Sequence, residues 1–256
     1  MKKAQVVKNK PLEKILVIPD QHFNINCNRA WKLLLLVAKQ LKPDIIVILG
    51  DMLDLADISR YSKDANIVAK VHEEISSGKQ ALDELTKVCK PYRKVFIEGN
   101  HEERLNTYKN DKAEALANLI NPIDELLGLE ERGWEFVKYK HSIKIGRCKF
   151  SHFFGHSGDI SVKKALEDGQ GYSMVFGHTH ALSYLTKRTD DGRVAQSITC
   201  GWGGDFKSID YRHQIKTKGY VQGCVIGYLF SSGTVQFVPV PFQRGSCVIE
   251  GKLISI

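Results

Sequence analysis

The feature that most constrains this 256-residue chain is a set of five short apolar runs, each followed by side chains that can bind a metal ion. Apolar, β-branched runs of this length bounded by glycine or proline are typical of buried strands. In open α/β sheets, ligands bind at the carboxyl ends of the strands. We therefore expect one site built from the segments DQH (20–22), GDMLD (50–54), GNHE (99–102), SH (151–152) and GHTH (177–180).

The first hundred residues alternate between strand-like and helix-like segments. Pro43 closes the first helical segment, since the residue before a proline is pushed out of the α region. Strands that alternate with helices predict a parallel sheet. We expect strands at Ile15–Ile18, Ile45–Leu49 and Val95–Ile97, with helices at 29–41 and at about Gln80–Cys89.

The second half of the chain contains pairs of strand-like segments separated by turn residues, which predict hairpins. We expect mostly antiparallel strands here, with one helix near Val162–Glu167. The segments interpreted as hairpins are 142–145 with 148–151, 181–187 with 194–199, and 220–230 with 234–238. The whole is interpreted as a mixed α/β sandwich in a single domain, 1–256. Its motifs lie within about 14–200, and strands from 201–256 complete the sheet.

Composition excludes several classes of protein. Hydrophobic residues make up 43% and charged residues 26% of the chain, as in soluble globular proteins. No apolar stretch approaches the roughly 20 residues that span a bilayer, and no secretory signal is recognisable. The six cysteines are widely scattered, which indicates reduced thiols rather than a disulfide framework. We expect a cytoplasmic protein without a membrane partner.

The residue types in the five segments favour a particular chemistry. Aspartate and imidazole together suit divalent first-row metals, and the absence of thiolates argues against structural zinc. In Asp20-x-His22 and His178-x-His180, the two side chains lie on the same side of an extended segment. A single carboxylate such as that of Asp51 can bridge two cations, which are then about 3.5–4 Å apart and suited to phosphoryl chemistry.

Each segment alone has a simpler interpretation. A lone Asp-x-His is usually part of a loop, and GD-x-x-D is more often a turn followed by a helix N-cap. Histidines near a strand end are commonly polar residues with ordinary hydrogen bonds. The occurrence of all five segments, each after an apolar run, favours a shared site.

The ordered set D-x-H, GD-x-x-D, GNHE, strand-end His and GH-x-H resembles the calcineurin-like metallophosphoesterase superfamily over about residues 14–200. The resemblance implies a four-layer α/β/β/α sandwich of two mixed β-sheets flanked by helices. It also implies two divalent metal ions, with manganese first and iron, zinc, nickel or cobalt as alternatives. One ion would be held by Asp20, His22, Asp51 and His180, and the other by Asp51, Asn100, His152 and His178. His101 would contact phosphate or protonate the leaving oxygen, and Asp54 would orient its neighbours.

Two departures from the family pattern bear on function. The segment GDMLDLAD (50–57) lacks the arginine of the serine/threonine phosphatases, which weakens a protein-phosphatase interpretation. The segment SHFFGHSG (151–158) offers both His152 and His156 as the fourth ligand. We prefer His152, because it directly ends the strand and its spacing resembles that of small bacterial and phage members.

These observations predict metal-dependent hydrolysis of phosphate esters. The leading hypothesis is a phosphodiesterase or nuclease acting on nucleic acid or nucleotides, and the closest alternative is a phosphomonoesterase. A binding scaffold without catalysis is the alternative of a different class. Such a scaffold should have lost ligands or the catalytic histidine, whereas every motif position is filled here.

A nucleic-acid substrate is suggested by the net charge of +8 and by two basic segments near the late motifs. Basic residues mixed with aromatic ones suit single-stranded nucleic acid. An ordinary solvated surface is the alternative interpretation. The segments comprise Lys138, Lys140, Lys144, Arg147 and Lys149, then Lys207, Arg212, Lys216 and Lys218, with Trp202, Phe206 and Tyr211 nearby.

Overall fold

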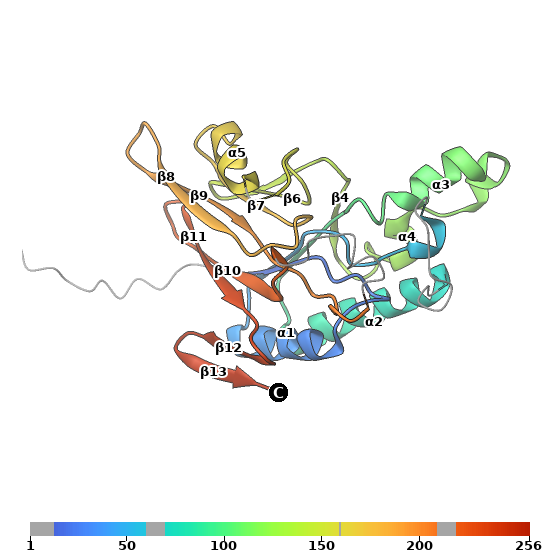
Figure 1. The fold of residues 1–256 in the computed structure, drawn as a ribbon, viewed down its shortest axis with the longest axis horizontal. Coiled ribbons are helices and arrows are strands. Elements are labelled where there is room, and N and C mark those ends of the chain that lie inside the picture. Colours follow the sequence, from blue (N-terminus) through green and yellow to red (C-terminus); the bar gives the residue numbers. More distant parts are fainter. Residues whose placement is uncertain (1–12, 60–69, 159, 209–218) are drawn as a thin grey trace, which may run out of the picture.

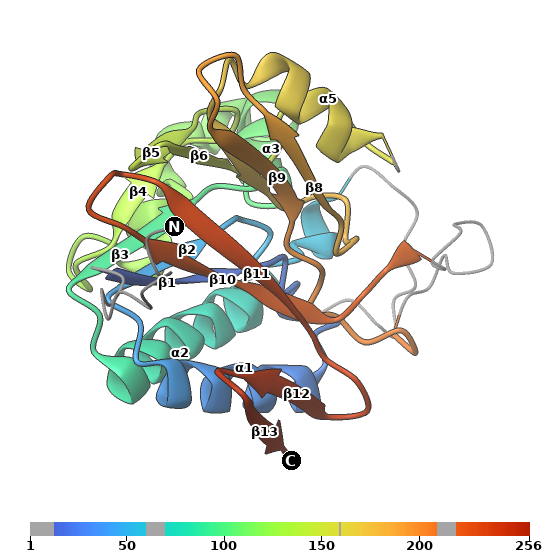
Figure 2. The same cartoon turned by 90° about the vertical axis from the view of Figure 1, so that its left-hand side faces the viewer.

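The computed structural model describes residues 13–59, 70–158, 160–208 and 219–256. Two β-sheets face each other, and helices lie on the outer side of each sheet (Figure 1). Figure 2 shows the same layers from the side, with α1 and α2 beneath the first sheet and α5 above the second. The expected four-layer α/β/β/α sandwich is confirmed.

The first sheet has six strands in the order β11-β10-β1-β2-β3-β4. The pairs β1–β2, β2–β3 and β3–β4 are parallel, as the alternation of strands and helices predicted, whereas β10 joins β1 antiparallel. The strands are β1 (Glu13–Ile18), β2 (Ile45–Ile48), β3 (Arg93–Ile97), β4 (Glu135–Val137), β10 (Gly223–Leu229) and β11 (Val235–Pro241).

The second sheet has five strands in the order β5-β6-β7-β9-β8. The expected hairpins are confirmed for β5–β6 and β8–β9, but the central pairs β6–β7 and β7–β9 are parallel. Turn residues between two strand-like segments predict only the pairing of strands that are neighbours in sequence. They could not predict the parallel pairs at the centre of this sheet. The strands are β5 (Ile143–Ile145), β6 (Cys148–Ser151), β7 (Ser173–Phe176), β8 (Tyr184–Arg188) and β9 (Val194–Thr199).

The helices agree with the sequence where an apolar stripe exists. Helix α2 begins at Val71, well before the expected Gln80. In its first turns only Val71 and Ile75 are apolar, and they are partly buried against the core, so the apolar signal there is weak. Helix α3 buries only Leu105 and likewise has a weak signal. The helices are α1 (Asn28–Leu41), α2 (Val71–Cys89), α3 (Arg104–Lys112), α4 (Ile123–Leu127) and α5 (Ser161–Asp168), with short 3-10 turns η1 (Ala56–Ile58) and η2 (Glu114–Leu119).

Alternation along the strands assigns side chains to the two cores. Leu16 and Ile18 of β1 pack in the core beneath the first sheet, to which α1 and α2 contribute, while Val17 packs between the sheets. On the outer side of the second sheet, Phe176 packs in a cluster with α5. Burial of each aliphatic side chain stabilises the folded state by roughly 1.5–3 kcal/mol. Packing on both faces of the first sheet therefore stabilises the strands whose ends carry the motif segments.

The C-terminal hairpin is a separate two-stranded sheet of β12 (Ser246–Ile249) and β13 (Lys252–Ser255). It lies beside α1 (Figure 1), and its Cys247 and Ile249 belong to the same core as that helix. All six cysteines are free thiols, and four of them are buried. Within the described residues, no helix is both long enough and apolar enough to span a bilayer.

Candidate metal centre

The segments that follow β1, β2, β3, β6 and β7 converge, as the sequence predicted. Three overlapping triads each bring their ligand atoms within 4.8 Å of one another. They share His22 and Asp51, so they form one continuous cluster rather than separate sites. The triads are Asp20, His22 and His180, then His22, Asp51 and His101, then Asp51, His152 and His178.

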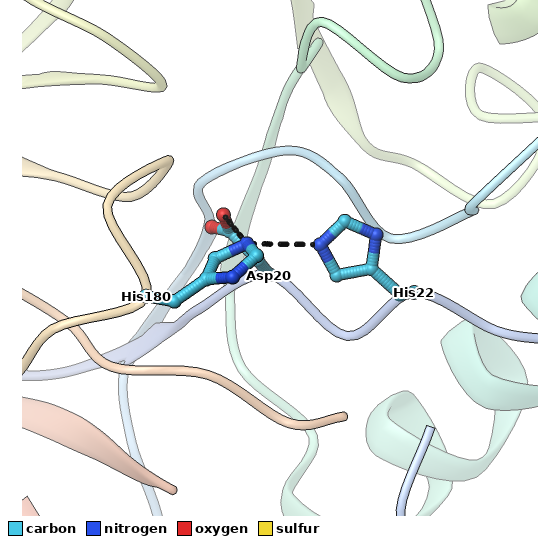
Figure 3. A group of neighbouring side chains, drawn as sticks. All are labelled: Asp20, His22 and His180. Atoms are coloured by element: carbon cyan, nitrogen blue, oxygen red, sulfur yellow. Dashed lines mark hydrogen bonds and ion pairs between the residues drawn. The ribbon is translucent and has the colours of Figure 1, made fainter. Parts of the chain in front are cut away.

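The first triad brings two histidine nitrogens face to face (Figure 3). The Nε2 atoms of His22 and His180 are 3.1 Å apart, and His180 Nε2 is 3.3 Å from Asp20 Oδ2. Because His22 Nδ1 lies 3.2 Å from the Asp54 carboxylate, it carries the proton and leaves a lone pair on Nε2. The buried Asp20 Oδ1 has no hydrogen-bond partner among the described residues. A divalent cation bound here would accept the lone pair of His22 Nε2 and give Asp20 Oδ1 a partner.

With neutral imidazoles, the second cluster also brings acceptor atoms together. His152 Nδ1 donates to the Leu49 carbonyl over 2.8 Å, so the neutral ring has its lone pair on Nε2. That Nε2 nevertheless faces Asn100 Oδ1 at 2.9 Å and Asp51 Oδ2 at 3.4 Å. Asn100 Oδ1 is also 2.7 Å from His178 Nδ1. Converging acceptors repel one another unless a cation lies between them, so these residues fit a bound metal.

Asp51 lies between the two clusters. Its main-chain carbonyl accepts hydrogen bonds from the N–H groups of Gln21 and His22, which joins the first two motif segments. Its Oδ1 accepts the main-chain N–H of His101 at 2.9 Å. The Oδ2 atom is therefore the one directed toward the ligands of the second cluster.

The backbone at the site is strained. His22, Asp51, His178 and His180 have φ angles of 49°, 47°, 65° and 57°, in the left-handed region that side chains disfavour. Such residues cost of order 1–3 kcal/mol each and gather at functional sites, where the surrounding fold enforces them. Gly177 is required in addition, because a Cβ there would collide with the Asp20 carboxylate.

The protonation states suit metal binding. Burial alone would raise the pKa of Asp51, but the imidazoles of His101 and His152 outweigh it and hold that pKa below the ordinary value. Burial lowers the pKa values of His22 and His178. Ionised carboxylates and neutral imidazoles are the forms that ligate metal ions.

His101 and Asp54 lie beside the cluster, where the sequence placed them. Asp54 Oδ1 is 3.1 Å from His101 Nδ1 and 3.2 Å from His22 Nδ1, so one carboxylate orients both rings. Burial alone would lower the pKa of His101, but the carboxylates of Asp51 and Asp54 outweigh it and raise the pKa to about 9. His101 Nε2 is 3.8 Å from Asp51 Oδ2, so His101 could also serve as a ligand on distance alone.

Two buried glutamates support the motif segments, and neither was among the predicted site residues. Glu102 accepts main-chain N–H groups from Asp51, Leu53 and Gly99, so it joins the GDMLD and GNHE segments. Its place in GNHE was the available signal. Glu74 of α2 accepts the N–H groups of Asp54 and Leu55, and no sequence pattern marks it.

Aromatic rings pack around His180, the last candidate ligand in the sequence. The Trp202 ring stacks on His180 with centroids 5.4 Å apart and an angle of 13°, and Tyr220 meets the same imidazole edge-on at 4.6 Å. Phe206 packs against Trp202 and is 39% exposed. The CGWGG segment (200–204) therefore positions His180, a role that could not be argued from its sequence.

The ambiguous histidine pair separates in space. His152 is fully buried within the cluster, whereas His156 Nε2 lies 2.6 Å from Asp168 Oδ2 in an exposed ion pair. This geometry favours His152 as the candidate ligand.

The described residues of the first basic segment do not all line one cavity. Lys138 and Lys140 line a cavity that reaches Asn100. Lys144 and Lys149 instead place their ammonium groups 4.9 Å from the Tyr172 ring centroid, and Arg147 lines a different cavity. Of the second segment only Lys207 is described, since Tyr211, Arg212, Lys216 and Lys218 lie outside the described residues.

The cavity at Asn100 has a volume of about 990 Å³ and is bordered by α3 and by the segment after β4. Among the described residues, its lining carries four cationic and five acidic side chains. The cations are Arg104, Lys112, Lys138 and Lys140, and the acids are Asp57, Glu98, Glu103, Asp111 and Asp124. A site with this balance does not select a polyanion by charge alone.

Comparison with known proteins gives one family and two phage relatives. A family model described as calcineurin-like phosphoesterase matches residues 13–182. The Gene 54 protein of Mycobacterium phage L5 is 25% identical over 276 residues, covering 95% of this chain and 99% of the relative. The Gene 54 protein of Mycobacterium phage D29 is 24% identical over 185 residues, covering 66% of this chain and 69% of the relative.

Solved structures with a similar fold are more distant in sequence. A single mutant of Vps29 from Entamoeba histolytica is 13% identical with a TM-score of 0.49, covering 95% of this chain and 99% of that one. A dimetal phosphatase from Danio rerio is 13% identical with a TM-score of 0.43, covering 90% and 99%.

Proposed function

The chain belongs to the calcineurin-like phosphoesterase family, and on this premise we propose that it hydrolyses phosphodiesters of nucleotide size with two divalent metal ions. The observation that carries the proposal is the pair of acceptor clusters that meet at Asp51. Mn²⁺ is the proposed metal, because aspartate, asparagine and neutral imidazole ligands suit such ions. Nothing in the described cluster resembles a scaffold that has lost its ligands, since each motif position carries a side chain able to bind.

The division of ligands follows the two clusters. Asp20, His22 and His180 would hold one cation, Asn100, His152 and His178 would hold the other, and Asp51 would contact both. Bound cations supply charge neutralisation at the phosphoryl oxygens and make water nucleophilic at neutral pH. Glu102 keeps the Asp51 and Asn100 segments in register by accepting three main-chain N–H groups.

His101 would act on the leaving oxygen. Its Nδ1 is held by Asp54, so Nε2 is the nitrogen available for proton transfer once it is free. General acid catalysis of this kind contributes about 10²–10⁴-fold. It matters most for an alkoxide leaving group, such as the ribose oxygen of a nucleotide diester, and least for nitrophenolate.

The cavity beside Asn100 supports a compact substrate. Its volume of about 990 Å³ is at the upper end of ordinary ligand pockets, which are about 300–1,000 Å³. Its mixed charge favours a ligand with one phosphate and a largely neutral remainder over a long polyanion. A nucleotide-sized diester fits both properties.

A substrate panel tests the proposal. Mn²⁺-loaded protein should hydrolyse bis-p-nitrophenyl phosphate and cyclic nucleotides faster than p-nitrophenyl phosphate, and EDTA should abolish both activities. Faster hydrolysis of the monoester would favour the phosphomonoesterase alternative. No hydrolysis of any ester by fully metal-loaded protein would favour the binding scaffold.

A nuclease acting on polymers is the second candidate, supported by the net charge of +8. Neutralising Z phosphates lowers log affinity with log salt at a slope of about −0.7Z for single strands. Lys140, which lines the cavity, and Lys144, which lies over Tyr172, make a matched pair for charge reversal. A nuclease requires a steep salt slope on oligonucleotides that Lys140→Glu reduces and Lys144→Glu leaves unchanged.

A further inference from the structure

The contacts of Arg104 place a guanidinium against the candidate acid. Nη1 of Arg104 donates to the Asp54 carbonyl over 2.6 Å, and Nη2 lies 2.9 Å from His101 Nε2. Arg104 is the second residue after the GNHE segment and was not among the predicted site residues. It is half-buried and lines the cavity that reaches Asn100.

The contact with Arg104 determines which ring nitrogen of His101 donates a hydrogen bond and which accepts one. A guanidinium has donors and no acceptor, so His101 Nε2 accepts a hydrogen bond for as long as Arg104 holds it. The proton is then on Nδ1, which lies 2.8 Å from the Asp54 carbonyl and 3.1 Å from its carboxylate. Both ring nitrogens of His101 are occupied, and neither can serve a substrate until Arg104 moves.

Among the described residues, Arg104 has hydrogen-bond partners that carry no formal charge. Within the described residues, no carboxylate lies in ion-pair distance of its guanidinium, although other arginines have one, such as Arg132 with Asp83. Its two partners are a carbonyl and a neutral ring nitrogen. Arginine binds the oxygens of phosphate more strongly, through charge-assisted and often paired hydrogen bonds.

We propose that Arg104 binds an anionic oxygen of the substrate phosphate, and that this exchange frees His101 Nε2, which then takes up a proton from water and faces the leaving oxygen. No covalent bond changes in the exchange, since one N–H···N hydrogen bond is replaced by an N–H···O hydrogen bond. The ligand class is a phosphate ester whose remainder lies in the cavity. The inference rests on the proposed function for the identity of the substrate, but the Arg104 site itself is a property of the protein.

Binding of inorganic phosphate tests the site without turnover. Calorimetry on protein of matched metal content should give a Kd at least about tenfold weaker for Arg104→Gln, since a hydrogen bond to a charged group contributes about 1.5–3 kcal/mol. Arg104→Lys keeps the charge and should lose less. Arg132→Gln is the matched control, because Arg132 pairs with Asp83 outside the cavity and should leave the Kd unchanged.

Nitrogen NMR of the histidine rings reads the release directly. Phosphate should shift the His101 Nε2 resonance in the wild type, whereas in Arg104→Gln that resonance should already lie at the released position and respond little. In kinetics, Arg104→Gln should raise KM on bis-p-nitrophenyl phosphate. Its kcat should change by a similar factor on nitrophenyl esters and on esters with alkoxide leaving groups, because His101 Nε2 is already free in this variant.

The outcomes separate the inference from the proposed function. A phosphate Kd for Arg104→Gln within twofold of the wild type, with an unchanged His101 response, overturns the inference even if esters are hydrolysed. Phosphate binding that depends on Arg104 supports the inference even if no ester in the panel is hydrolysed, in which case only the proposed function fails.

Discussion

Glu74 offers a sharp test of how the fold supports the site. Its side chain is 1% exposed, and Oε2 accepts the main-chain N–H groups of Asp54 at 2.9 Å and Leu55 at 2.7 Å. Oε1 is buried without a hydrogen-bond partner among the described residues. Burial raises the pKa of Glu74 from 4.5 to about 8, despite the two donors. The substitution Glu74→Gln keeps the shape and the accepting oxygen but removes the titration.

The sign of the pH effect follows from proton counting. Between pH 4.5 and about 8, folded Glu74 retains its proton while the unfolded chain has lost it. Stability of the wild type therefore falls as the pH rises through this window. At about 1.4 kcal/mol per pH unit, the full effect is roughly 4–5 kcal/mol. Allowing for relaxation around the carboxylate, we expect about 2–4 kcal/mol between pH 5 and pH 8.

The assay is urea unfolding at several pH values from 5 to 8, followed by circular dichroism, on the wild type and Glu74→Gln. Other titrating groups contribute equally to both proteins, so they cancel in the difference. The variant should gain stability relative to the wild type as the pH rises, while Glu130→Gln, which removes an exposed carboxylate, should follow the wild type. A difference that stays constant from pH 5 to pH 8 would refute the reasoning and show that Glu74 is folded as a carboxylate.

Three further predictions concern the centre itself. Asp51→Asn removes the charge shared by both clusters, so metal analysis should find both ions lost together; two ions retained per chain would contradict the assignment. His101→Asn should keep the metals and slow hydrolysis of alkoxide esters by about 10²–10⁴-fold, with a smaller loss on nitrophenyl esters, and equal losses would mean that His101 acts through binding or structure. His152→Ala should lower metal occupancy and activity together, whereas His156→Ala should spare both because its ring pairs with Asp168 at the surface. The reverse pattern would make His156 the ligand.

Local patterns in the sequence determined where the strands end and which side chains follow them. Runs such as Ile45–Leu49 are recognisable because burial on both faces demands continuous apolar, β-branched residues. The polar residues that follow must then lie at a strand end. Each candidate ligand was identified on this basis, and the structure brings all of them together.

Elements without a local pattern were missed for a physical reason. Helix α3 buries a single residue, and the first turns of α2 offer only the partly buried Val71 and Ile75 to the core, so the apolar signal of both segments is weak. The parallel centre of the second sheet joins β6, β7 and β9, which are not neighbours through hairpins. Pairing between distant strands is decided by packing, which no short window of sequence contains.

What only the tertiary structure decided is the set of contacts between residues far apart in the chain. His22 and His180 are 158 positions apart, yet their Nε2 atoms are 3.1 Å apart. The choice between His152 and His156 depends on which ring the fold turns inward. The roles of Glu74 and Arg104 depend on contacts with Asp54, which lies 20 and 50 positions away in sequence. Residue type and spacing specify what a side chain can do, but the partner that it meets is set by how the two sheets and their helices pack.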